Sequence, residues 1–264
     1  MRRSNTLPLA HVFGVRIGAA PSWFLFLGLS VVFLATNFGD WIPTASTNTR
    51  FALAATAALT FSASVALHEL GHALTARRFG IEVLGIDLWV LGGFTHLSRE
   101  PQRPREEFLI AAAGPAVNAV LVGLCVAFTA AVVPDDLTLM QALGGTQTTE
   151  PLVVLGSWLT LINGGLLLFN LLPGFPLDGG RMAQAVIWRL TGNRGRATRL
   201  AGVAAAVVSV RIGPARSATA AGRAADIGAE LHEPVDGVRV EAVAGRWPLD
   251  VAAHDAGLAE DLEV

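Results

Sequence analysis

The sequence contains no lysine, a single cysteine and few charged residues. All 19 basic residues are arginines, which excludes Schiff-base chemistry and a phosphate-binding loop that depends on lysine. Cys125 cannot form an internal disulfide, and we interpret it as a small apolar residue of a helix. Charged residues make up 15% of the chain, against about 25% in an average soluble domain. The net charge of −2 indicates no nucleic-acid partner.

Apolar residues are abundant and lie in long runs. They make up 52% of the sequence, and a helix that spans a membrane needs about 20 of them in succession. Four segments approach or exceed this length, at residues 22–38, 51–67, 108–133 and 151–177, although prolines interrupt the end of the fourth. We therefore predict an all-α polytopic membrane protein with about four transmembrane helices, embedded in a lipid bilayer.

The arginines are concentrated in every second segment that connects the predicted spans. They are concentrated before the first span, between the second and third spans, and after the fourth, whereas the loops 39–50 and 134–150 contain only Arg50. Because positive residues favour the cytoplasmic side, this pattern predicts a multi-pass protein of the cell membrane with its N-terminus in the cytoplasm. We expect the lead-in, residues 1–23, to be cytoplasmic or interfacial and not a removed signal peptide.

The segment between the second and third spans has a different character. Residues 81–100 are too interrupted by glycine to span a membrane, and their β-branched and apolar residues indicate short strands with a turn near Gly92 and Gly93. We predict a small membrane-associated β-hairpin or re-entrant loop against the cytoplasmic face.

The second apolar segment ends in a metal-binding pattern, H-E-x-x-H, formed by His68, Glu69 and His72. On a helix, positions i and i+4 share a face, so the two imidazoles can bind one zinc ion while the glutamate acts as a base. Counted from Phe51, His68 lies about 25 Å along the helix and inside the bilayer, where ionisable side chains are functional by default. The alternative is three polar side chains that reach for the interface, but apolar residues continue the helix beyond the motif.

A catalytic zinc site needs a third protein ligand, and Asp178 is the main candidate. It lies in F-N-L-L-P-G-F-P-L-D-G-G-R, residues 169–181, whose prolines and glycines must break the fourth span. Broken backbone at membrane depth is tolerated only beside protein or a wet cavity, so the carboxylate should point into a polar pocket. Two alternatives stay open: a helix-capping role for Asp178, and His96 as the third ligand, although His96 is more typical of an exposed loop histidine.

Together, H-E-L-G-H and N-L-L-P-G-F-P-L-D-G-G-R resemble the site-2 protease family of intramembrane zinc metalloproteases. The likeness includes L-G-G at 91–93 and R-E-E-F-L-I-A-A-A-G-P-A-V-N-A-V-L at 105–121 and covers roughly residues 1–200. It implies that His68, His72 and Asp178 bind one Zn²⁺ and that Glu69 is catalytic. It also implies hydrolysis of a peptide bond within or next to a transmembrane segment of a substrate protein, that is, regulated intramembrane proteolysis.

Several further roles stay open. Asn118 and Asn170 lie in apolar runs, where such amides usually bond to another helix, but either could orient substrate or stabilise a developing oxyanion. The hairpin with Gly92 and Gly93 could receive an unwound substrate as an added strand or could plug the cytoplasmic opening. The competing function is a catalytically inactive scaffold of the same fold that binds transmembrane segments. The sequence leaves the oligomeric state open.

The sequence changes character near residue 200. From there on it is rich in alanine and glycine, with five arginines against ten acidic residues and few large apolar side chains. Such a segment buries too little surface to fold well alone. We expect residues 1–199 to form the intramembrane metalloprotease domain and residues 200–264 an atypical acidic Ala/Gly-rich tail. A native, disordered tail, a truncation and a shifted reading frame stay open as explanations.

Overall fold

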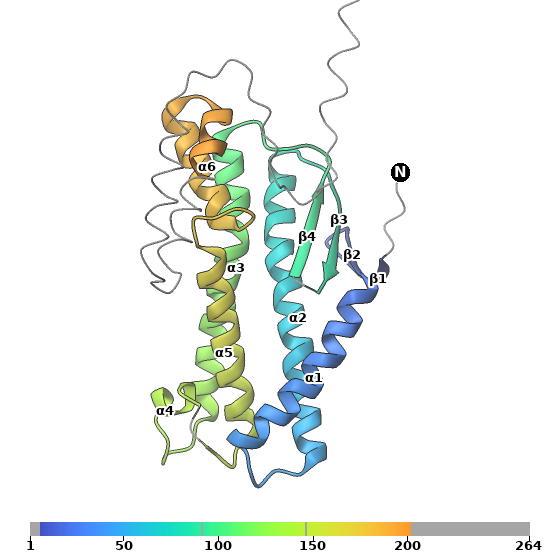
Figure 1. Ribbon diagram of the computed structural model, residues 1–264, viewed down its shortest axis with the longest axis vertical. Coiled ribbons are helices and arrows are strands. Elements are labelled where there is room, and N and C mark those ends of the chain that lie inside the picture. Colours follow the sequence, from blue (N-terminus) through green and yellow to red (C-terminus); the bar gives the residue numbers. More distant parts are fainter. Residues whose placement is uncertain (1–5, 91, 146, 202–264) are drawn as a thin grey trace, which may run out of the picture. The chain divides into compact units, whose positions relative to one another are not determined.

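The computed structural model describes residues 6–90, 92–145 and 147–201 (Figure 1). The predicted tail, residues 200–264, lies outside the described residues from residue 202 onward. In chain order the elements are β1 (Leu7–Val12), β2 (Val15–Ala19), α1 (Pro21–Trp41), α2 (Thr47–Arg78), β3 (Val83–Trp89), β4 (Gly92–Leu97), α3 (Pro104–Val132), α4 (Leu139–Leu143), α5 (Pro151–Asn170) and α6 (Asp178–Thr191).

Within the described ranges, four helices are long and apolar enough to cross a membrane, namely α1, α2, α3 and α5. The predicted fold class, four spanning helices with a small β element, is confirmed. Helix α5 ends at Asn170, several residues before the end of the predicted span. The reason is Pro173 and Pro176, which lack the N–H groups that would continue the helix.

Large apolar side chains cover the outer surface of these helices. More than half of the residue surface is exposed at Leu25, Phe33, Leu59, Val120, Leu124 and Leu168, which are spread over all four. Contiguous apolar surface of this extent is unusual for a soluble monomer. Such an apolar surface fits a lipid bilayer. Helices are stable there because they satisfy their backbone hydrogen bonds internally.

Helix α3 packs against α2, α5 and α6, and so it joins the parts of the bundle. Gly71 of α2 allows a close approach, because a Cβ there would lie 2.9 Å from the Ala113 carbonyl oxygen of α3. Helix α1 packs on α2 and α5 through a separate apolar cluster that includes Phe38, Ala54 and Leu159. Figure 1 shows α6 and the sheet toward one end of the bundle and α4 at the other.

In the described part of the chain, four strands form one sheet in the order β1-β2-β3-β4. The predicted hairpin is present as β3 and β4, which pair antiparallel. The lead-in, to which the sequence analysis assigned no structure, supplies β1 and β2, and β2 pairs parallel with β3. One face of the sheet packs on α2 through an apolar cluster that includes Ile17, Ile86 and Leu70. This packing fixes β4 beside the helix that carries the histidines.

Candidate metal centre

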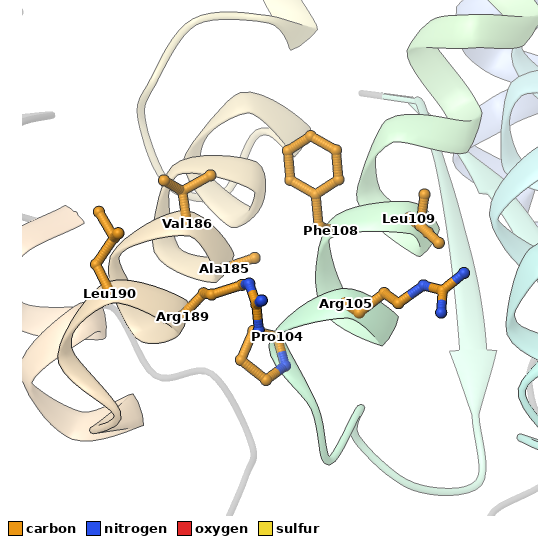
Figure 2. Close-up of a pocket in the computed structure, with 8 residues that line it drawn as sticks. All are labelled: Pro104, Arg105, Phe108, Leu109, Ala185, Val186, Arg189 and Leu190. Carbon is orange, nitrogen blue, oxygen red and sulfur yellow. The ribbon is translucent and has the colours of Figure 1, made fainter.

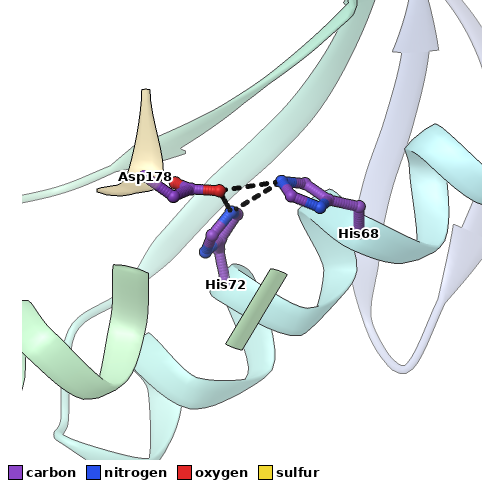
Figure 3. A group of neighbouring side chains, drawn as sticks. All are labelled: His68, His72 and Asp178. Carbon is purple, nitrogen blue, oxygen red and sulfur yellow. Dashed lines mark hydrogen bonds and ion pairs between the residues drawn. The ribbon is translucent and has the colours of Figure 1, made fainter. Parts of the chain in front are cut away.

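Figure 3 shows three buried side chains that meet between two helices. His68 and His72 lie one turn apart on α2, and Asp178 is the first residue of α6. The His68 Nε2 and His72 Nε2 atoms are 3.1 Å apart. The Asp178 Oδ2 atom lies 3.1 Å from the first and 3.2 Å from the second. The structure therefore brings together the three residues that the sequence analysis named as ligands.

The orientation of His72 shows which of its nitrogen atoms is free. Its Nδ1 atom is 2.6 Å from the Ile110 carbonyl oxygen of α3, and a carbonyl only accepts hydrogen bonds. Nδ1 therefore carries a proton, and in the neutral imidazole the lone pair lies on Nε2, the atom that faces Asp178 and His68. A hydrogen bond from the second ring nitrogen to a backbone carbonyl is the usual support for a metal-binding histidine.

The three atoms fit one zinc ion. Ligand atoms about 2.0–2.1 Å from a tetrahedral zinc ion are about 3.3 Å from one another, close to the observed 3.1, 3.1 and 3.2 Å. Asp178 Oδ2 is also buried, and apart from the two imidazole nitrogens it has no polar partner among the described residues. A lone pair and a carboxylate oxygen facing each other are stabilised by a cation between them.

The two histidines of the cluster lie within α2 and not at its end. His68 and His72 precede Arg77 by nine and five residues, which corresponds to about 14 and 8 Å along the helix. Ser46 caps the start of α2, where its hydroxyl accepts a hydrogen bond from the Thr49 N–H at 3.2 Å. Arg77 and Arg78 occupy its last turn, where they complement the helix dipole. The histidines thus lie inside the apolar span.

Glu69 is held by strand β4. The Thr95 hydroxyl donates to Glu69 Oε2 at 2.7 Å, and the lack of a side chain at Gly93 leaves room for the glutamate. A Cβ at Gly93 would collide with Glu69 Cγ. The predicted hairpin between the second and third spans therefore contacts the candidate base directly through β4.

Glycines also shape the walls of the cluster. A Cβ at Gly114 of α3 would collide with His72 Nε2 and lie 2.6 Å from His68 Cε1. At the start of α6, a Cβ on Gly180 would lie 2.6 Å from the Gly174 backbone, and a Cβ on Gly179 would collide with the carbonyl oxygens of Leu171 and Leu172. The absence of side chains at these positions lets α3, α6 and the loop before α6 close around the histidines.

Asp178 does not act as the N-cap of α6, since that position is occupied by Leu177. His96 lies in β4 and its Nε2 atom is 3.0 Å from Asp87 Oδ2, in a group that also contains Arg16. His96 is therefore part of the sheet and not of the metal cluster. Both alternatives that the sequence left open are thereby disfavoured.

The four residues predicted to contact substrate or support the site are spread over α3, α5 and β4. Asn118 of α3 is fully buried, and neither its Oδ1 nor its Nδ2 atom has a hydrogen-bond partner among the residues described. Asn170 is the last residue of α5 and is partly buried. Gly92 begins β4 with a φ of 140°, which favours glycine, and Gly93 follows it against Glu69. The roles predicted for these residues stay predictions.

Three contacts that support the site were not predicted from the sequence: the Ile110 carbonyl, the Thr95 hydroxyl, and an ion pair between Glu107 and Arg181. The available signal was the spacing of Glu107, Ile110 and Gly114, which puts them on one face of a helix. Backbone carbonyls leave no trace in a sequence, and nothing local distinguishes Glu107 from Glu106.

A separate groove of about 720 Å³ lies between α3 and α6. Figure 2 shows Phe108 and Leu109 on one side of it, Val186 and Leu190 on the other, and Arg189 extending toward Pro104. None of the three residues of the metal cluster lines this groove. The candidate metal centre therefore lies outside this groove.

Residues 56–211 match the model of peptidase family M50. A protein of Synechocystis sp. named as a zinc metalloprotease (sll0528) is 37% identical over 202 residues, covering 75% of this chain and 48% of its own. A Mycobacterium tuberculosis protein named as a zinc metalloprotease (Rip3) is 35% identical over 212 residues, covering 79% and 51%. The solved structure of the site-2 protease from Methanocaldococcus jannaschii is 23% identical, with a TM-score of 0.44 over 74% of this chain and 77% of that one.

The chain spans about half the length of the curated relatives that it matches. The matched region begins within α2, before both histidines, and continues past α6. It covers more than half of the chain and contains both motifs on which the resemblance was based. The chain belongs to peptidase family M50, the site-2 protease family.

Proposed function

We propose that this protein is an intramembrane zinc metalloendopeptidase that hydrolyses a peptide bond within or next to a transmembrane segment of another protein. The observation that carries the proposal is the meeting of His68, His72 and Asp178 inside an apolar span, with donor atoms 3.1–3.2 Å apart. Ionisable side chains at such depth are expensive and usually functional. The names of the M50 relatives support the same metal and the same class of reaction.

His68, His72 and Asp178 would hold the zinc ion, which leaves one position open for water or substrate. When bound, zinc supplies Lewis acidity and lowers the pKa of a bound water to about 7. The protein's own part is to fix the donors: the Ile110 carbonyl orients His72, and Gly114 lets both rings approach α3.

Glu69 is the candidate general base. It follows His68 on α2, and its Oε2 atom accepts the hydrogen bond from Thr95. We propose that it takes a proton from the attacking water and passes it to the departing amide nitrogen. The hydrogen bond from Thr95 holds the carboxylate in one orientation, so that less ordering is required at the moment of reaction.

Strand β4 is the candidate docking edge for the substrate. A peptide bond in a helix is protected by its hydrogen bonds, so a transmembrane substrate must unwind before it is cut. In the described sheet β4 is an edge strand that pairs with β3, and it contacts Glu69 through Thr95. An unwound segment added to this edge would lie next to the candidate base. The alternative role, closing the cytoplasmic opening, uses the same strand.

Asn118 is a candidate for contacts to the substrate backbone. It lies one helical turn beyond Gly114, and its buried amide has no partner among the described residues. A buried unpaired amide is costly, and a peptide carbonyl or N–H group of a bound substrate would satisfy it. Helix-to-helix bonding by Asn118 is the competing explanation.

The experiment compares Glu69→Gln with Glu82→Gln, an exposed glutamate outside the site, in the full chain. Each is co-expressed with a library of single-pass reporters that differ in the transmembrane segment, and the zinc content of detergent-purified protein is measured. We expect wild type and Glu82→Gln to release the same fragments and Glu69→Gln to lose at least about a hundredfold in rate while it retains zinc.

Ligand variants complete the test. His72→Ala and Asp178→Ala should both lose zinc, whereas Asp136→Ala, an exposed aspartate of the loop before α4, should retain it. Fragments released equally by wild type and Glu69→Gln would identify the protein as the inactive scaffold. Zinc bound equally well without Asp178 would overturn the proposed ligand set.

A further inference from the structure

An ion pair between a buried glutamate and a partly exposed arginine, Glu107 and Arg181, lies near the cluster. Glu107, in the first turn of α3, is 3% exposed, and its Oε1 atom accepts a hydrogen bond from Arg181 Nε at 2.9 Å. Arg181 is three residues after Asp178 on α6, so it occupies the next turn of the same helix. A carboxylate this deeply buried requires a partner of opposite charge, and Arg181 is that partner.

Glu107 shares one face of α3 with the residues that support the histidines. Glu107, Ile110 and Gly114 are spaced by three and four positions, which aligns them along the helix. Ile110 accepts the hydrogen bond of His72, and Gly114 contacts both imidazoles. The same face of α3 therefore contacts α2, through the histidines, and α6, through Arg181.

We propose that Glu107 and Arg181 form a positioning pair, which sets α6 on α3 so that the Asp178 carboxylate meets the two histidines of α2. This inference rests on the proposed function in that Asp178 is taken as a ligand. Arg181 is on the same helix as Asp178, and Glu107 is on the same helix as Ile110, so the pair acts through the position of Asp178 relative to the histidines. The chemical class of ligand that depends on the pair is a divalent metal ion.

The ion pair adds a directional contact to the packing of α6 on α3. Gly179 and Gly180 pack against the backbone of residues 171–175, which is a loop and not a part of α3. The pair instead connects α6 directly to the helix that orients His72. An arginine Nε–H within a planar guanidinium group is a directional donor, so the pair constrains the rotation of α6 as well as its distance.

The structure contains a matched control. Arg194 and Glu100 form a second ion pair at 2.7 Å, which connects the segment before α3 with the segment after α6. Its side chains are 36% and 68% exposed, and exposed pairs contribute little. Glu100→Gln therefore removes an ion pair between the same two regions without touching the buried face of α3.

The test measures zinc affinity in the detergent-purified full chain by competition with a chromophoric chelator. Its second readout is the visible absorption spectrum of the Co²⁺-loaded protein, and its third is the thermal midpoint of the metal-free protein. We expect Glu107→Gln and Arg181→Gln each to weaken zinc binding by about 10- to 100-fold and to alter the Co²⁺ spectrum. Glu100→Gln should stay within about twofold of wild type. The double variant should be no weaker than the weaker single one, because the two residues act as a unit.

Three results would overturn the proposal: affinities of both single variants within twofold of wild type, effects that multiply in the double variant, or an unchanged Co²⁺ spectrum with only the thermal midpoint lowered. If Glu107→Gln does not fold, Arg181→Lys keeps the charge but not the planar donor, and the same expectations apply to it. A wild-type protein that binds no zinc would instead contradict the proposed function.

Discussion

Gly114 shows how a missing side chain can determine a metal site. It lies in the interior of α3, where glycine is normally unfavourable by about 1 kcal/mol relative to alanine. Here glycine is needed because it leaves space for two imidazoles. One of them, that of His72, donates a hydrogen bond to the Ile110 carbonyl, one turn earlier on α3. The rings could not both reach Asp178 if α3 were displaced to make room for a methyl group.

We expect Gly114→Ala to lower the free energy of unfolding by about 1–3 kcal/mol, because the added methyl group overpacks a rigid contact, and to weaken zinc binding. A Cβ placed on Gly123 of the same helix would have no neighbouring atom within 4 Å, so Gly123→Ala should be neutral or stabilising by up to about 1 kcal/mol. Unfolding in mixed micelles with increasing SDS, together with zinc titration, measures both. Equal effects of the two substitutions would show that the space at Gly114 is not required.

At the scale of elements, β4 has two connections that the predicted hairpin alone did not reveal. Through β3 it belongs to a sheet that the lead-in completes, and through Thr95 it reaches the carboxylate of Glu69 on α2. The Arg77 guanidinium also donates to the Phe13 carbonyl oxygen at 2.5 Å, which ties the turn between β1 and β2 to the end of α2. A strand that pairs with β3 and contacts α2 through Thr95 can hold the candidate base in place.

Thr95→Val removes the hydroxyl that donates to Glu69 but keeps the size and branching of the side chain. We expect about tenfold slower cleavage of a reporter found with wild-type protein, with zinc content unchanged, because the carboxylate loses its orientation and not its neighbours. Thr95→Ser retains the hydroxyl and should retain most of the activity. If the serine and valine variants are equally slow, the hydrogen bond is not what matters at this position.

At the scale of the whole molecule, the distribution of the arginines predicts an orientation in the membrane. The turns near residues 43 and 135 lie at one end of the bundle, whereas the histidine end of α2, the start of α3 and the start of α6 are associated with the arginine-rich segments. The proposed orientation puts this second group on the cytoplasmic side. The zinc site would then open toward the cytoplasmic half of the bilayer.

Cysteine labelling in intact cells tests this orientation in a Cys125→Ala background. A membrane-impermeant thiol reagent should label Asp135→Cys from outside, whereas Gln102→Cys should be labelled only after the membrane is permeabilised; both positions are exposed. The permeabilised sample serves as the control for reactivity. Labelling of Gln102→Cys from outside would reverse the proposed topology.

Residues with local chemistry were predictable. The spacing of His68 and His72 puts them on one face of any helix. The prolines before Asp178 end α5 through their own covalent structure, whatever the tertiary fold. Thr95, Ile110 and the Glu107–Arg181 pair were not predictable, because each acts through a partner far away in the chain. The strands of the lead-in were missed for the same reason: β2 is defined by its pairing with β3, about 70 residues later.

The four spanning helices, the two histidines on one helical face and the break before Asp178 follow from local features of the sequence. Hydrophobic length, helical period and the geometry of proline are local properties, so no tertiary contact is needed to read them. Only the tertiary structure decided that Asp178 meets the histidines, that Thr95 holds Glu69 and that α3 contacts both halves of the centre. These depend on how helices pack, and packing is set by the fit of distant side chains and glycines against one another.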